Sequence, residues 1–111
     1  MKIRHADAAP GQSVENTFIA LDELESVIGE AGVTECFVPA LCPERPHHIL
    51  VRAGCDAQAE SALLGAATAR ALVLARMRPD VPALVYAECA PGDGERLRAL
   101  EALGYRDEDG L

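Results

Sequence analysis

The feature of this sequence that most constrains its fold is a strand–helix–strand pattern in residues 47–89. Residues 49–51 form a short apolar run, which predicts a strand buried on both faces. Residues 57–77 are rich in alanine and leucine and contain no proline, which predicts a long helix. Residues 83–89 predict a second strand. Because the helix crosses between the two strands, the pattern indicates a parallel, right-handed βαβ unit.

The rest of the chain predicts further short elements around this unit. Residues 1–6 favour a strand, 34–38 a second short strand, and 94–103 a helix that ends at Gly104. Residues 13–28 predict an amphipathic helix, because apolar side chains recur there at spacings of three and four. These apolar residues are Val14, Phe18, Leu21, Leu24 and Ile28. The expected fold is α/β, with a small mixed sheet and helices packed on its faces.

Composition narrows the class of protein. At 111 residues the chain is expected to form one domain, residues 1–111, with a core of its own. The formal net charge of −8 argues against nucleic-acid binding, because an acidic surface repels phosphate backbones. No apolar run follows Lys2 and Arg4, and no stretch is long enough to span a bilayer. We therefore expect a soluble, cytoplasmic protein that does not bind membranes.

Several stretches resemble one known family. SALLGAATARAL, then ALVYAEC, then ERLRALEALGYRDEDG resemble the second half of a GNAT-superfamily N-acetyltransferase. The opening MKIRHADAAP is similar to the first strand and turn of that family. The most specific part is LEALGY at residues 100–105, which looks like the end of the family's last helix. The resemblance covers residues 1–30 and 47–110, and it implies a GNAT-like fold.

The extent of the resemblance leaves three alternatives open: a reduced GNAT domain, a partial one from a longer protein, or a different α/β protein. The family carries an antiparallel hairpin before its central strand and two more strands after its last helix. Residues 33–46 leave room for one strand and a loop, and no sequence corresponds to the final strands. We therefore expect a chain that lacks the family's hairpin and its closing strands.

Family members bind acetyl-CoA between the two central parallel strands. The resemblance places the pantetheine arm along residues 50–52 and the pyrophosphate on residues 56–61, where free amides at a helix start bind anions. The cofactor-contacting residues that it implies are Leu50, Val51, Arg52, Gln58, Ala59, Glu60 and Ser61. Gln58 and Glu60 stand where the family has glycines. A carboxylate beside a diphosphate costs on the order of 1–4 kcal/mol at surface-like dielectric, whereas in the first turn of a helix it is favourable.

The catalytic signals are weak. The resemblance places the family's frequent general acid, a tyrosine, at the position of Leu100, and it makes Tyr105 a core residue. Tyr86 lies in the middle of a predicted strand and is also expected in the core. His48 is a candidate general base at the start of the central strand. Cys55 is a candidate nucleophile because it precedes a predicted helix start.

The cysteines are expected to be reduced and free of metal. Cys36, Cys42, Cys55 and Cys89 lack the C-x-x-C spacing of structural zinc sites. Cytosolic thiols stay reduced, and Cys36 and Cys89 are predicted to pack as small apolar residues. No metal site is predicted.

Two functions from different classes remain open. The favoured one is a GNAT-like domain with a degenerate cofactor loop that acts as a binding or assembly module. The alternative is an active N-acetyltransferase that moves acetyl from acetyl-CoA to a primary amine, for which the acidic surface favours a cationic substrate. The strand at residues 83–89 is expected to have an uncovered edge, which predicts a homodimer or pairing with a partner GNAT domain.

Overall fold

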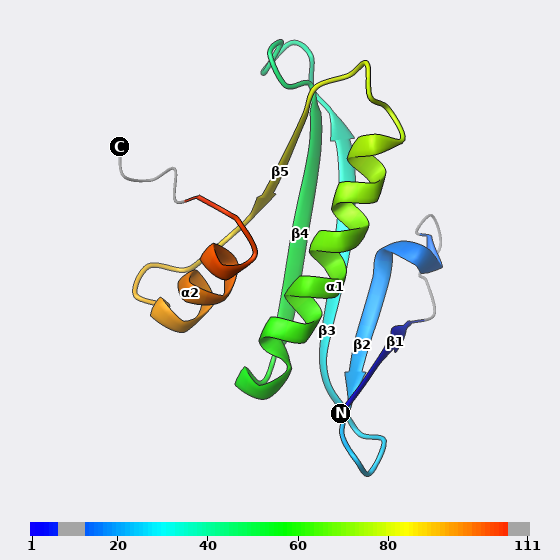
Figure 1. Cartoon of the computed structure of the whole chain (residues 1–111), viewed down its shortest axis with the longest axis vertical. Helices are drawn as coiled ribbons and strands as arrows, with labels where there is room; N and C mark the ends of the chain where they lie inside the picture. The colour runs from blue at the N-terminus through cyan, green and yellow to red at the C-terminus, as the bar shows by residue number, and fades with distance from the viewer. Residues whose placement is uncertain (7–12, 107–111) are drawn as a thin grey trace.

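The computed structural model describes residues 1–6 and 13–106, which form a five-stranded mixed sheet and two α-helices. The strands are β1 (Lys2–His5), β2 (Thr17–Leu21), β3 (Val27–Phe37), β4 (His47–Cys55) and β5 (Ala83–Ala87). The helices are α1 (Ala57–Arg76) and α2 (Gly94–Ala102), and a 3-10 turn, η1 (Val14–Asn16), precedes β2. The strands follow one another across the sheet in sequence order (Figure 1). The predicted α/β class and mixed sheet are confirmed.

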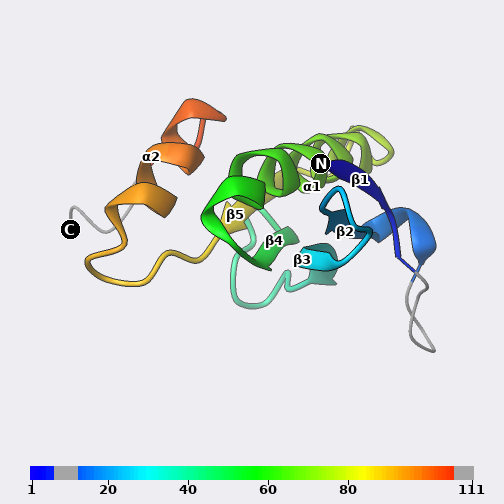
Figure 2. The same ribbon diagram turned by 90° about the horizontal axis from the view of Figure 1, so that it is seen from below.

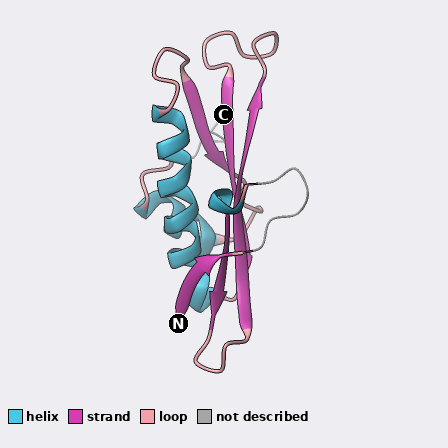
Figure 3. Cartoon of the chain, turned by 90° about the vertical axis from the view of Figure 1, so that its right-hand side faces the viewer, coloured by secondary structure: helices cyan, strands magenta, loops and turns pink. Residues whose placement is uncertain are grey.

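The predicted βαβ unit is present. β4 and β5 are parallel with α1 between them in sequence, and the other three neighbouring pairs are antiparallel. Both α-helices lie on the same face of the sheet (Figures 2 and 3). The expectation that helices cover both faces is not met by the described residues, since neither α-helix packs on the opposite face.

The core lies between α1 and the strands β2, β3 and β4. Side chains of α1 with no exposed surface are Ala59, Leu63, Leu64, Ala67 and Ala71. On β4, Ile49 and Val51 point into this core, whereas His48 and Leu50, which alternate with them, are half-buried on the uncovered face. The prediction that this strand is buried on both faces is therefore wrong, because α1 covers one face only.

Residues 13–28 form a hairpin instead of the predicted helix. Phe18 and Ala20 of β2 point into the core, and β3 follows after a short turn. Val14 and Leu24, which a helix would have placed on its apolar face, are 49% and 86% exposed. The β-branched residues of this segment favour a strand, since they pack well on a pleated surface. The spacing of three and four is a coincidence of sequence, since Phe18 and Ile28 lie on two different strands.

The turn of this hairpin is fixed by one carboxylate. Asp22 Oδ1 accepts hydrogen bonds of 2.9 Å from the backbone amides of both Leu24 and Ser26. Glu25 has a φ of 61°, a left-handed conformation that few residues other than glycine adopt. Its carboxylate lies 3.2 Å from Lys2 Nζ on β1. Local hydrogen bonding of this kind lets a short acidic sequence reverse the chain without glycine at that position.

β3 is longer than the strand predicted from the sequence. The strand predicted at residues 34–38 is the end of β3, which has 11 residues and pairs with β4 along its length. The β2–β3 hairpin therefore occupies residues 17–37, which include most of the segment predicted to be a helix. Gly29 and Gly32 lie within β3.

We predict that Gly29→Ala destabilises the domain by about 1–3 kcal/mol, the usual cost of overpacking a core. A Cβ at Gly29 would collide with Cys55 Cβ and lie 3.0 Å from Cys55 Cα, so the backbone of β4 would have to shift. Urea unfolding followed by circular dichroism measures the change. Gly54→Ala is the matched control, because a Cβ there meets nothing within 4 Å. Equal stability of the two variants would contradict the observed β3–β4–α1 packing.

Candidate functional site: the β4–β5 divergence and the outer cleft

β4 and β5 separate toward the start of α1. Their ladder runs from His47 paired with Ala83 to Val51 paired with Ala87, where β5 ends. β4 continues to Cys55 and remains paired with β3 on its other side. The two parallel strands thus diverge below their ladder (Figure 1). Among the described residues, no strand neighbours the backbone of β4 beyond Val51 on the β5 side.

An arginine of α2 fills this divergence. Arg96 donates a 3.0 Å hydrogen bond from one terminal nitrogen to the Ala53 carbonyl oxygen. Its Nε lies 3.2 Å from Glu60 Oε2 at ion-pair distance, although the N–H is not aligned for a hydrogen bond. The two side chains are only 17% and 15% exposed. We call this set the Arg96 bridge: it joins α2 to both the end of β4 and the first turn of α1.

The residues implied as cofactor contacts are only partly gathered here. Leu50 and Val51 fall within the ladder to β5, and the Arg52 side chain is exposed, with a terminal nitrogen 3.3 Å from Thr34 Oγ1. Ala59 is fully buried in the core beneath α1. Of the residues implied as the pyrophosphate loop, Glu60 is the one that joins the Arg96 bridge.

No described side chain caps the start of α1. Gln58 and Ser61 are exposed on the first turn of α1. Asp56 occupies the N-cap position, and its side chain makes no capping hydrogen bond; its carbonyl oxygen accepts from the Ala59 amide. The Asp56 carboxylate therefore does not cap the helix, although aspartate at an N-cap position commonly does.

Cys55 lies close to the charged groups of Glu60, Arg96 and Asp56. Burial raises the pKa of the Cys55 thiol, and the Glu60 and Asp56 carboxylates raise it further, while the Arg96 guanidinium acts in the opposite direction. A raised pKa leaves less thiolate at neutral pH, and the thiolate is the nucleophilic form. These surroundings oppose the role of nucleophile that the sequence suggested for Cys55.

We predict that iodoacetamide at pH 7.5 modifies Cys36 well before Cys55. Cys36 is exposed, whereas Cys55 is half-buried with a raised pKa. Peptide mass spectrometry over a time course gives both rates. Glu60→Gln removes one charge that raises the Cys55 pKa, so it should speed modification at Cys55 and leave Cys36 unchanged. Faster labelling of Cys55 than of Cys36 in the unmodified chain would contradict this assignment.

His48 lies on the uncovered face of the sheet. Its ring meets that of Tyr86 edge-on, with centroids 5.8 Å apart and planes at 74°. His48 Nε2 is enclosed and has no hydrogen-bond partner among the described residues. Tyr86 is half-buried, so its expected place in the closed core is wrong. The ring of His48 is thus placed by packing against Tyr86.

A second histidine, which is itself buried, forms a cluster with exposed neighbours that the sequence did not suggest. His47 is fully buried, and its Nε2 lies 2.6 Å from Glu35 Oε2 on β3. Phe37 stacks on its ring at 4.5 Å, and the Arg78 guanidinium lies 4.9 Å above the Phe37 ring. The β3–β4 register creates this cluster, since it pairs Phe37 with His47. A histidine and a glutamate twelve residues apart carry no signal until that register is known.

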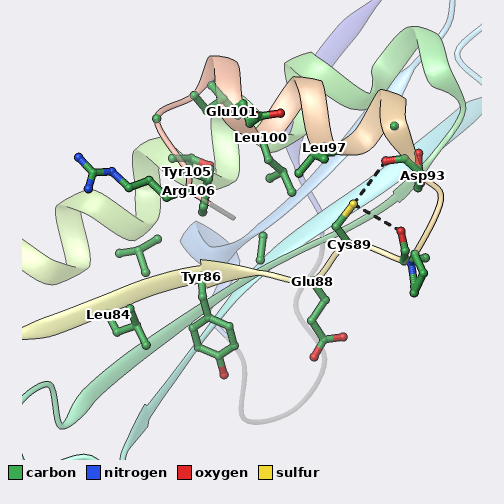
Figure 4. A pocket seen from close by; sticks show the side chains of 18 of the residues that line it. Leu84, Tyr86, Glu88, Cys89, Asp93, Leu97, Leu100, Glu101, Tyr105 and Arg106 are labelled. Carbon is green, nitrogen blue, oxygen red and sulfur yellow. Dashed lines mark hydrogen bonds between the residues drawn. The ribbon is translucent and has the colours of Figure 1, made fainter. Parts of the chain in front are cut away.

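A cleft opens on the outer side of β5, beside the strand edge that is not paired with β4. It has a volume of about 1130 Å³, with β5 at its base and α1 and α2 as walls (Figure 4). Leu97 and Leu100 of α2 face it, and Tyr105 and Arg106 follow α2 along its rim. We call this space the outer cleft. Leu100 is itself 4% exposed, so the position implied for the family's general acid holds a core residue.

Tyr105 ties the end of α2 to the long helix. Its hydroxyl lies 2.7 Å from Thr68 Oγ1 on α1, and its ring packs against the core as the resemblance implied. Gly104 before it has a φ of 99°, which confirms the predicted left-handed end of the helix. Burial raises the pKa of Tyr105, and the hydrogen bond from Thr68 partly offsets this.

We predict that Tyr105 makes the domain lose stability as the pH rises above about 10, the ordinary tyrosine value. Its folded-state pKa is raised, so the unfolded chain ionises first and is favoured as the pH rises. Tyr105→Phe should remove this alkaline loss and cost about 1–2 kcal/mol at pH 7, because Thr68 loses its partner. Urea midpoints at pH 7 and above 10 measure both effects. Tyr86→Phe, without this hydrogen bond, should follow the unmodified chain.

The cysteines do not cluster. All four are free thiols, and Cys36 is exposed, so its predicted packing as an apolar residue is wrong. Cys89 is half-buried against the core and donates weakly to the carbonyl oxygens of Ala90 and Asp93, at 3.7 and 3.5 Å. Within residues 1–6 and 13–106, no three His, Cys, Asp or Glu side chains gather closely enough to hold a metal ion.

None of the helices in the described part of the chain is both long enough and apolar enough to cross a membrane. Comparisons of the chain with protein-family models, curated proteins and solved structures gave no match. The geometry of the Arg96 bridge and the outer cleft is therefore what bears on its function.

Proposed function

We propose that this chain is a GNAT-like domain whose cofactor position is filled by its own Arg96, and that it acts as a binding or assembly module. The observation that carries this proposal is the Arg96 bridge between β4, α1 and α2. The helices and strands of this chain resemble those of the family, whereas its cofactor loop does not.

The topology supports the GNAT-like part of the proposal. A hairpin, a long central strand, a crossover helix and a parallel strand that diverges from its neighbour follow one another in the order the resemblance implies. The hairpin formed by β2 and β3 stands where the sequence alone indicated a helix. These features are those of a class of folds, and the fold by itself does not supply an activity.

The Arg96 bridge supports the proposed loss of cofactor binding. An incoming acetyl-CoA arm needs backbone groups of the central strand, and the Ala53 carbonyl already accepts from Arg96. A net charge-assisted hydrogen bond contributes about 1.5–3 kcal/mol, so breaking it lowers affinity by roughly tenfold or more. Glu60 lies beside Arg96 and presents a carboxylate where a diphosphate would rest.

The proposal predicts that acetyl-CoA binds the unmodified chain with a Kd weaker than ~1 mM, about −4 kcal/mol. Titration calorimetry measures it. Glu60→Gln leaves Arg96 without its anion at the first turn of α1, so acetyl-CoA should bind about tenfold more tightly to this variant. Gln58→Gly with Glu60→Gly should also raise the affinity, since both the charge and the bulk are removed.

Two further variants control for charge and for the bridge itself. Glu95→Gln removes the same charge from an exposed site on α2 and should change nothing. Arg96→Met combined with Glu60→Gln removes both the obstruction at the Ala53 carbonyl and the carboxylate, so it should bind acetyl-CoA at least as tightly as Glu60→Gln alone. A micromolar isotherm for the unmodified chain would overturn the proposal of a closed cofactor site.

An active N-acetyltransferase is the second candidate, and one observation favours it. His48 keeps an enclosed, unpartnered nitrogen beside Tyr86 on the strand that leads to the divergence. A base there would accept the proton of an amine as it attacks acetyl-CoA. Acetyl-CoA turnover with a panel of cationic amines, lost in His48→Ala, would establish this activity in place of the module.

A further inference from the structure

We propose that the partner of this module is a second copy of the same chain, which pairs antiparallel along the free edge of β5 and extends the sheet across a two-fold axis. This inference rests on the proposed role in assembly and names its partner. The outer cleft borders the same edge, so it becomes part of the contact.

The two edges of the sheet differ in their charge. β1 forms one edge, and its four residues include Lys2 and Arg4, which discourage another strand from pairing. β5 forms the other edge with the sequence ALVYA, which has no charge. Beyond β4, no described strand pairs with it. An uncharged edge of this kind is the one that another strand can extend.

The register of β5 is self-complementary. An antiparallel pairing centred on Val85 places Leu84 opposite Tyr86 of the second copy, and the two-fold axis repeats that pair. Both side chains lie on the face away from the helices, as Figure 4 shows. Aromatic–aliphatic pairs across neighbouring strands stabilise sheets, whereas Ala83 and Ala87 on the other face leave room for the partner.

Four of the five charged residues that line the outer cleft favour the same direction, and the fifth is Glu101 on α2. Arg106 lies toward the Leu84 end of β5, whereas Glu88 and Asp93 lie toward its other end (Figure 4). Arg45 also lines the cleft, and it precedes β4 at the end where His47 pairs with Ala83. Antiparallel pairing therefore brings the basic end of each copy to the acidic end of the other. Parallel pairing would oppose like charges.

The walls of the outer cleft supply apolar surface that the proposed dimer would bury. Leu72 of α1 and Leu103 after α2 both line it and are 43% and 38% exposed. Five residue pairs of strand alone fall short of the roughly 800 Å² per partner that a stable interface usually buries. The two-fold axis places both clefts on the same side of the extended sheet, so these leucines join the interface.

Multi-angle light scattering and sedimentation equilibrium between 1 and 100 μM test the pairing. The expected species is a dimer with twice the chain mass of 11.8 kDa. Glu88→Arg sets like charges against Arg45 at both symmetry-related contacts, and it should weaken the dimer about tenfold or more. Arg45→Glu should do the same. Both residues are exposed, so neither change threatens the core.

The doubly reversed variant, Arg45→Glu with Glu88→Arg, should restore the dimer, because each end again meets its opposite charge. Glu95→Arg is the matched control: it changes the net charge equally on an exposed part of α2 outside the cleft. A monomer at 100 μM overturns the inference. A dimer that tolerates Glu88→Arg as well as Glu95→Arg also overturns it, since its interface then lies elsewhere. Either result is independent of acetyl-CoA binding, which tests the proposed closed site separately.

Discussion

The close packing of α1 against the sheet is the interaction on which the rest of the structure depends. Only 4% of the residues are aromatic, so small and medium side chains must fill the core. Alanines on the buried face of α1, at positions 59, 67 and 71, let the helix lie near β2–β4, and Leu63 and Leu64 fill the space between. Dispersion attraction at such short range compensates for the area that large rings usually bury. The crossover helix then fixes β5 parallel to β4.

Once α1 is fixed, the position of α2 follows from polar contacts at both of its ends. Asp93 caps its start by accepting from the Arg96 amide, and the Arg96 side chain reaches the carbonyl of Ala53. At the other end, Tyr105 meets Thr68. Paired charges contribute little net stability when partly buried, but they oppose displacement of either partner. The same helix therefore closes the β4–β5 divergence and forms a wall of the outer cleft.

The sequence predicted the second half of the fold well and the first half poorly, for physical reasons. Residues 57–77 have a composition that only a helix suits, and prolines delimit the strand at residues 83–89. In residues 13–28 the spacing of apolar side chains fits a helix as well as it fits two strands. The turn at Asp22 makes this segment a hairpin and not a helix. Its hydrogen bonds come from backbone amides, which every residue except proline has, so the residue types of the turn do not reveal them. Strand preference depends on such context more than helix preference does.

The site was harder to predict than the fold, because its contacts join residues far apart in sequence. From the sequence, Glu60 has two interpretations. It is a carboxylate where a diphosphate would rest, or it is a favourable acidic residue in the first turn of a helix. The structure adds Arg96, thirty-six positions later, and the two charges become one ion pair. Nothing in the pattern of α2 distinguishes Arg96 from the exposed Arg98, since both flank Leu97. Only the relative placement of α2 and β4 selects the inward-facing arginine, so the closing of this site is a property of tertiary packing.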